Sequence, residues 1–109
     1  MNSQTIFALA SGGGKAGVAV YRVSGSNAKD AYRALTGTDL PAARRAQRVR
    51  ITGGGDTGLI DHGLALWFPA PNSFTGEDVA EFHLHGGRAV HGVMLDALAA
   101  QQEMRPAEP

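Results

Sequence analysis

The sequence predicts an α+β domain built on a mixed sheet of about five strands with two or three helices. Apolar or alternating runs of strand length recur along the chain. Turns rich in glycine and proline separate them, and two segments have the apolar spacing of a helix with one buried face. With 109 residues, the chain has the size of one domain and would bury roughly 65% of its unfolded surface, which is enough for a modest core.

The first third of the chain predicts two strands and a helix. Residues 5–10 form a short apolar strand, and a turn over residues 11–14 leads to a β-rich apolar run over residues 18–23. We expect Ser26 to cap a helix and Gly37 to end it. The buried stripe of this helix would consist of Ala28, Ala31, Tyr32 and Leu35.

The glycines at positions 12, 14 and 17 match the pattern G-x-G-x-x-G, but their context argues against a dinucleotide site. That fingerprint opens a helix whose N-terminus holds the pyrophosphate, whereas a β-rich run follows here. Gly14-Lys15-Ala16 also fails as a phosphate-binding loop, because a hydroxyl residue after the lysine and a glycine five residues before Gly14 are missing. We therefore expect a glycine turn between two strands.

Arg22 is unusual because its neighbours are apolar. On an extended segment its side chain shares a face with Val18 and Val20. Arginine is rarely buried without an anionic or carbonyl partner. Arg22 therefore either binds such a ligand, or reaches water from a strand end, or forms a structural ion pair, and the residue types leave these alternatives open.

The only basic cluster of the chain consists of Arg44, Arg45, Arg48 and Arg50. Val49 and Ile51 alternate with its last two members, as on a half-buried strand. Clustered cations are enough to bind RNA phosphates, but the segment has no aromatic side chain on which a base could stack. We favour a solvated face, followed by a hairpin turn over residues 53–58 and a strand over residues 59–68.

The stretch from Pro69 to Arg88 places many polar groups between two apolar runs. Residues 64–68 are apolar on both faces, as in a central strand, and Pro69 ends this strand because proline cannot donate to a ladder. A specified turn follows, formed by Asn72, Ser73, Thr75 and Gly76. Glu77 and Asp78 are expected either to cap local turns or to bias the entry into the next strand.

Residues 79–85 alternate as a strand that directs Glu81, His83 and His85 to one side. Buried polar groups at such positions need partners. Gly86-Gly87 then leads into a second helix, whose N-terminus could attract an anion. Its expected buried face consists of Val90, Val93, Met94, Ala97 and Leu98.

The histidines raise the alternative of a metal site. His83 and His85 share a strand face, and His62 or His91 would have to complete a ligand set. Because no third and fourth ligand can be identified, we predict no metal and favour ordinary hydrogen-bonded histidines. A ligand-contact role for His83 and His85 stays open.

Two motifs together resemble the N-terminal domain of the tRNA-modification GTPases of the MnmE family, also called TrmE. The first reads LWFPAPNSFTGEDV over residues 66–79 and is followed by HGG at residues 85–87. The second combines TIFA at residues 5–8 with GVAVYRVSG at residues 17–25. The resemblance extends over essentially the whole chain and is weakest between residues 39 and 58.

The resemblance implies a folate-binding fold similar to that of aminomethyltransferases, which binds 5-formyl-tetrahydrofolate at or near a homodimer interface. The folate-binding arginine of the family corresponds to Arg22, and its folate-binding glutamate corresponds to Glu81. A carboxylate suits the pterin edge, whose 2-amino group and adjacent ring N–H are paired donors. The guanidinium of Arg22 would suit a pterin or formyl oxygen, or the glutamyl tail.

For the parent protein, the resemblance implies GTP hydrolysis coupled to an aminomethyl-type modification at C5 of the wobble uridine of tRNA, together with a flavin-containing partner protein. We expect residues 1–109 to be one folate-binding and dimerisation domain that is not itself catalytic, an N-terminal fragment. Four features of the family would lie beyond residue 109: a folate-contacting lysine, the helical domain, the GTPase domain that binds GTP with Mg²⁺ and K⁺, and a catalytic cysteine. Without them, we expect residues 1–109 to bind folate more weakly than the parent protein does. The family usually has PGRGG at residues 13–17, so the role of Lys15 stays open.

The composition of the chain predicts its cellular location. The chain has ten basic and ten acidic side chains, no cysteine, and no apolar run near the ~20 residues of a membrane span. The N-terminus also lacks a secretory signal, so we expect a cytoplasmic protein without membrane contact.

Two alternative functions stay open. The first is a fragment of a folate-dependent aminomethyltransferase-like protein, against which residues 71–78 argue. The second is a structural or RNA-docking module based on the arginine cluster.

Overall fold

The computed structural model describes residues 5–10, 17–53, 58–73, 75–101 and 104–107. Its elements are β1 (Thr5–Leu9), β2 (Val18–Ser24), α1 (Ala28–Thr36), β3 (Gln47–Thr52), β4 (Leu59–Phe68), β5 (Val79–His85), α2 (Arg88–Ala99) and β6 (Met104–Pro106). The predicted α+β class is therefore confirmed. The expected turn over residues 11–14 and the side chain of Lys15 lie outside the described residues.

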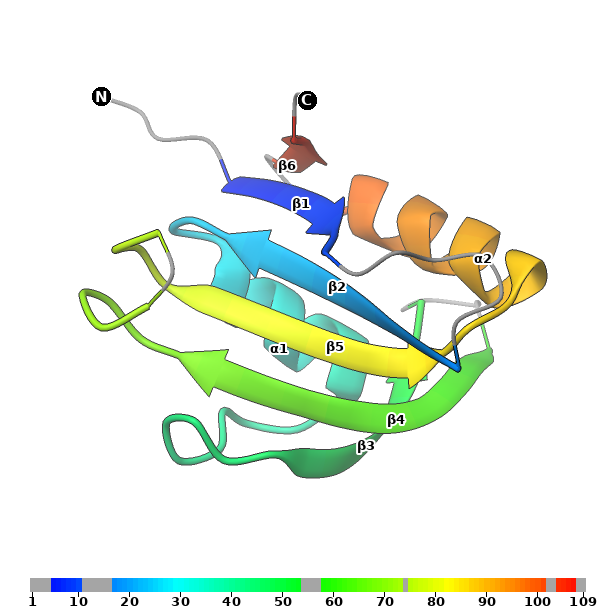
Figure 1. The fold of residues 1–109 in the computed structure, drawn as a ribbon, viewed down its shortest axis with the longest axis horizontal. Coiled ribbons are helices and arrows are strands. Elements are labelled where there is room, and N and C mark those ends of the chain that lie inside the picture. The colour runs from blue at the N-terminus through cyan, green and yellow to red at the C-terminus, as the bar shows by residue number, and fades with distance from the viewer. Residues whose placement is uncertain (1–4, 11–16, 54–57, 74, 102–103, 108–109) are drawn as a thin grey trace.

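The strands form one six-stranded sheet in the order β3-β4-β5-β2-β1-β6 (Figure 1). β1 and β6 are parallel, and the other neighbours are antiparallel, so the sheet is mixed as predicted. The strand that the sequence did not reveal is β6, because three residues are too few to show a period of two. β2 and β5 lie at the centre of the sheet.

One face of the sheet is covered, and it holds the core. In Figure 1, α1 lies behind the sheet. The strand period directs Tyr21 and Phe82 to this face, where the ring centroid of Phe82 lies 5.9 Å from that of Tyr32 in α1. Met94 and Leu98 of α2 belong to the same buried cluster. Both helices therefore pack on the same side.

The opposite face of the sheet, which we call the open face, is crossed by no helix among the described residues (Figure 1). Alternation places on it the side chains that point away from the core. Its members are Ile6 and Ala8 of β1, Val18, Val20 and Arg22 of β2, Glu81 and His83 of β5, Leu64 and Leu66 of β4, and Arg48 and Arg50 of β3.

The ends of the helices correct two expectations. Ser26 does not cap α1: the N-cap is Asn27, which forms no side-chain cap bond, and its backbone N–H donates instead to Oγ1 of Thr5 at 2.8 Å. The left-handed Gly37, with φ of 68°, ends the helix as predicted. Val93 was expected to be buried but is 43% exposed, because only Met94, Ala97 and Leu98 of the apolar side chains of α2 are buried.

The loop between β4 and β5 closes one end of the open face. The hydroxyl of Ser24, at the end of β2, lies 2.7 Å from Oγ1 of Thr75 and donates to Oε1 of Glu77 at 3.4 Å. Asp78 accepts a hydrogen bond from the backbone N–H of Ala70 at 2.9 Å, eight residues earlier, so it joins the two ends of this loop instead of capping a local turn. The loop is thereby fixed to the central strand β2.

Among the described residues, no helix is long and apolar enough to cross a bilayer.

Candidate functional site

Arg22 and Glu81 face each other at the centre of the open face. They are direct partners in the antiparallel pairing of β2 with β5. Nε and Nη2 of Arg22 donate to Oε2 of Glu81 at 2.9 and 2.7 Å. The side chain of Glu81 is only 9% exposed and that of Arg22 is 29% exposed, so this charge pair is largely shielded from water.

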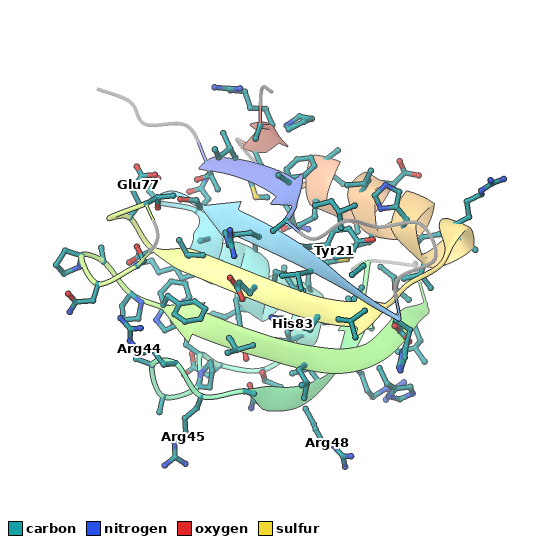
Figure 2. All side chains as sticks on the ribbon, in the orientation of Figure 1. Tyr21, Arg44, Arg45, Arg48, Glu77 and His83 are labelled. Carbon is teal, nitrogen blue, oxygen red and sulfur yellow. The ribbon has the colours of Figure 1, made fainter. Side chains whose placement is uncertain are left out.

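His83 completes a three-residue network with this pair. Its Nε2 lies 3.0 Å from Oε1 of Glu81, whereas the hydrogen bond from Nε of Arg22 reaches Oε2. Because an ionised carboxylate only accepts hydrogen bonds, the imidazole is the donor here. Figure 2 shows His83 in the middle of the sheet. Each oxygen of Glu81 therefore has a partner, which is what a nearly buried carboxylate requires.

The network of Arg22, Glu81 and His83 is bordered by a polar loop at one end of the sheet and by apolar side chains on the neighbouring positions. Towards the end of β2, the loop that carries Glu77 lies at the end of the sheet and is joined to it by the hydrogen bond from Ser24 (Figure 2). Leu66 of β4 is the direct neighbour of Glu81 across the sheet, and Val20 precedes Arg22 on the same face of β2. The charged network thus lies on an apolar surface, where electrostatic interactions are stronger than in water.

A hollow of about 580 Å³ lies on the β3 side of the open face. Its polar lining comes from Arg48 and Arg50 of β3, with His62 of β4 and His85 at the end of β5. Leu64 provides an apolar wall. We call this hollow the cationic groove, because two guanidinium groups line it.

The register of the β3–β4 hairpin builds the groove. Arg48 pairs with Leu64, and Arg50 pairs with His62. The arginine cluster is visible in the sequence, but its proximity to these histidines is not. The alternation of arginines on residues 47–52 was the available signal, but the register that brings His62 opposite Arg50 depends on the hairpin pairing.

The predicted arginine cluster is divided between different roles. Arg44 has a left-handed backbone with φ of 65°, donates to the carbonyl oxygen of Asn72 at 2.6 Å, and lies over the Phe68 ring at 5.8 Å. It therefore fixes the loop after β4. Arg45 is exposed, and Arg45 and Arg48 extend from the lower margin of the sheet in Figure 2.

Asp61 fixes His85 at the end of the groove. Its carboxylate accepts from the backbone N–H of His85 at 2.8 Å, lies 3.0 Å from Nδ1 of that imidazole, and accepts from the backbone N–H of His62 at 2.8 Å. Burial raises the pKa of Asp61, but these hydrogen bonds outweigh it and hold the pKa below its ordinary value. Asp61 is not part of the lining itself, but its carboxylate holds the two histidine residues that are.

The histidines do not converge on one point. His83 contacts Glu81, His85 contacts Asp61, and Nδ1 of His91 lies 2.9 Å from the hydroxyl of Tyr21, whose pKa burial raises. Within the described residues, no group of three or more histidine, cysteine, aspartate or glutamate side chains is arranged to hold a metal ion. The geometry thus favours binding chemistry based on hydrogen bonds and ion pairs.

The architecture defines a class of small α+β domain, in which helices cover one face of a mixed sheet and the other face presents charged side chains. Comparison with known proteins identifies the family. Residues 5–109 match the family described as GTP-binding protein TrmE N-terminus. The chain belongs to this family.

Relatives from bacteria and a vertebrate are similar over almost the whole chain. It is 58% identical over 107 residues to the tRNA modification GTPase MnmE of Paramagnetospirillum magneticum, covering 98% of this chain, and 56% identical over 108 residues to that of Rhodopseudomonas palustris, covering 99%. It is 54% identical over 104 residues, 95% of this chain, to the mitochondrial 5-taurinomethyluridine-[tRNA] synthase subunit GTPB3 of Danio rerio. The matched segments span 24%, 23% and 21% of these relatives.

Proposed function

We propose that this chain is the folate-binding and dimerisation domain of a tRNA-modification GTPase, and that it binds 5-formyl-tetrahydrofolate at Arg22 and Glu81. The observation that carries the proposal is the direct pairing of these two side chains across β2 and β5 on the open face. They are the two positions to which the family resemblance assigns folate contacts. Membership of the TrmE N-terminal family supports the same function.

The geometry of Glu81 suggests how the pterin ring would bind. A carboxylate has about four acceptor positions, of which Arg22 occupies two and His83 occupies one. The paired donors of a pterin edge therefore need at least one of these bonds to be released. Arg22 is the more exposed partner in the ion pair and can turn its guanidinium towards a ligand oxygen, so that neither charge loses its partner.

In the parent protein, the bound folate would act as the one-carbon carrier for an aminomethyl-type modification at C5 of the wobble uridine of tRNA. GTP hydrolysis would take part, as in the relatives named tRNA modification GTPase. The family resemblance adds a flavin-containing partner protein. The domain itself would hold the carrier and would not be catalytic. A cytoplasmic location accords with this role.

Titration of the 109-residue chain with 5-formyl-tetrahydrofolate tests the binding proposal. Isothermal calorimetry is expected to show saturable binding of one ligand per protomer, because Arg22 and Glu81 are both present and already adjacent. A chain with both residues replaced, R22Q/E81Q, should show no saturable heat under the same conditions. Absence of binding to the unmodified chain at ligand concentrations up to about 1 mM, a standard free energy near −4 kcal/mol, would refute the proposal.

Dimerisation is proposed to use the β1–β2 half of the open face. Val18 is 51% exposed there, and Ile6, Ala8 and Val20 extend the apolar surface. A stable interface needs roughly 800 Å² per partner, which an uncovered sheet face can supply. The edge strand β3 is less suitable, because Arg48 on an edge opposes pairing with a second copy.

Charge placed on this surface should prevent the association. Sedimentation velocity is expected to show a dimer for the unmodified chain and a monomer for V18E, because each copy would then have to bury an unpaired carboxylate in an apolar contact. V93E is a matched control, since Val93 is 43% exposed but lies on α2. A monomer at every concentration of the unmodified chain, or equal effects of both variants, would rule out this interface.

A further inference from the structure

We propose that the cationic groove is a second part of the ligand site, which binds the carboxylates of the glutamyl tail of the folate and favours a poly-γ-glutamyl form. This inference rests on the proposed function, because it assumes that the pterin ring lies at Arg22 and Glu81. It assigns a role to a hollow on the open face that binding of the pterin ring does not use.

The chemistry of the groove favours a small anionic group. Neither Arg48 nor Arg50 forms an ion pair with a carboxylate among the described residues, although each projects beside the hollow. The carboxylate of Asp61 is occupied by hydrogen bonds from His85 and His62. Two guanidinium groups are thus available for a carboxylate, with which arginine forms planar, paired hydrogen bonds.

The sheet register places the groove at a suitable distance from the pterin position. Glu81 pairs with Leu66, and Arg48 pairs with Leu64, so the two residues are separated by two strands and two positions along the strand. With strands ~4.8 Å apart and ~3.4 Å per residue, their Cα atoms are about 12 Å apart. In a folate, the p-aminobenzoyl ring separates the pterin from the first glutamate, so the tail would emerge over the groove.

An apolar side chain lies on the path between the two ends. Leu64 pairs with both His83 and Arg48, is 39% exposed, and forms one wall of the groove. A benzoyl ring that crosses from Glu81 to Arg48 would cover this side chain and remove apolar surface from water. The order of polar, apolar and cationic groups across β5, β4 and β3 therefore follows the order of pterin, benzoyl and glutamate.

The shape of the groove favours this ligand over RNA. A hollow of about 580 Å³ is within the usual range of small-molecule sites, roughly 300–1,000 Å³. RNA phosphates are bound by broader basic surfaces, and the lining of the groove includes no Phe, Tyr or Trp side chain on which a base could stack. Binding of tRNA by the groove is therefore the competing outcome of the experiment below.

The experiment compares three ligands with the 109-residue chain and with R48Q/R50Q. The ligands are a 5-formyl-tetrahydropterin without a tail, 5-formyl-tetrahydrofolate with one glutamate, and its tri-γ-glutamyl form. The unmodified chain is expected to bind the triglutamate most tightly. R48Q/R50Q should lose on the order of tenfold in triglutamate affinity, as expected for two exposed charge pairs, and should bind the tail-free pterin as the unmodified chain does.

A charge-matched control separates the groove from general electrostatics. R45Q/R88Q removes two exposed arginines that do not line the groove, and it should leave all three affinities within about twofold of the unmodified chain. Circular dichroism establishes that each variant is folded before titration. Arginine-to-glutamine changes on exposed strand positions preserve length and hydrogen-bonding ability, so folding is expected to persist.

Each other outcome overturns the inference. Equal triglutamate affinities of R48Q/R50Q and R45Q/R88Q would exclude a role for the groove while leaving the folate proposal intact. An equal loss for the tail-free pterin would show that the arginines act on the pterin position or on the fold. Weaker tRNA binding with unchanged folate binding would assign the groove to RNA. Absence of binding of any folate to the unmodified chain would refute both proposals.

Discussion

Replacement of Glu81 by glutamine is expected to weaken binding of 5-formyl-tetrahydrofolate by about 100-fold, the effect of losing a charge-assisted hydrogen bond in a shielded site. The amide keeps one acceptor but replaces the other by a donor, which faces the donors of the pterin edge. Glu81 is only 9% exposed, so water cannot compensate for the mismatch. Calorimetry with E81Q measures the loss directly, and R22Q is expected to weaken binding in the same direction.

The exposed ion pair between Arg33 and Asp39 is a matched control. Its Nε to Oδ1 distance is 3.0 Å, but the two side chains are 48% and 82% exposed. R33Q and D39N therefore remove the same kinds of charge in a solvated setting and should change folate affinity by less than about twofold. Unchanged folate affinity in both E81Q and R22Q, with wild-type circular dichroism spectra, would remove these residues from the site.

Replacement of Gly63 by alanine is expected to lower the free energy of unfolding by about 2–3 kcal/mol, as overpacking of a filled interior does. A Cβ at this position in β4 would collide with the carbonyl oxygen of His83 and lie 2.8 Å from Cδ2 of Leu84. The backbone of β5 would have to move, and this strand carries the carboxylate of Glu81. Urea denaturation of G63A measures the change in stability, and folate titration should show weakened binding as well.

The same substitution at Gly92 is expected to change the free energy of unfolding in the opposite direction. It lies inside α2, and a Cβ there would meet nothing within 4 Å. Alanine is favoured over glycine in a helix by roughly 0.8–1 kcal/mol, so G92A should be slightly more stable than the unmodified chain. A G63A chain as stable as G92A would mean that β4 and β5 are not as closely packed as the structure shows.

The strands that carry the candidate site could be predicted because their signal is local. A side-chain period of two requires only extended backbone, so the sequence places Arg22 on one face with Val20 and places Glu81 on one face with His83. Structure and sequence agree on these assignments. The family resemblance added the folate roles of Arg22 and Glu81, and these roles remain predictions.

Other features depended on contacts between segments that are distant in the sequence. Val93 was predicted to be buried because it is apolar and follows the helical pattern, but no part of the described sheet covers it. The cap of α1 was assigned to Ser26, whereas Thr5 of β1 supplies the acceptor from 22 positions away. Neither packing partner can be recognised from the residues that surround these positions.

The sequence by itself determined the α+β class, the boundaries of the long strands and the strand faces on which Arg22 and Glu81 lie. The tertiary structure decided that β2 lies beside β5 in the register that brings Arg22 opposite Glu81, and that the β3–β4 hairpin gathers Arg50 and His62 at one groove. The physical reason is that backbone geometry sets the direction of a side chain locally. Strand order and register, in contrast, are set by the packing of a core whose members are far apart in the chain.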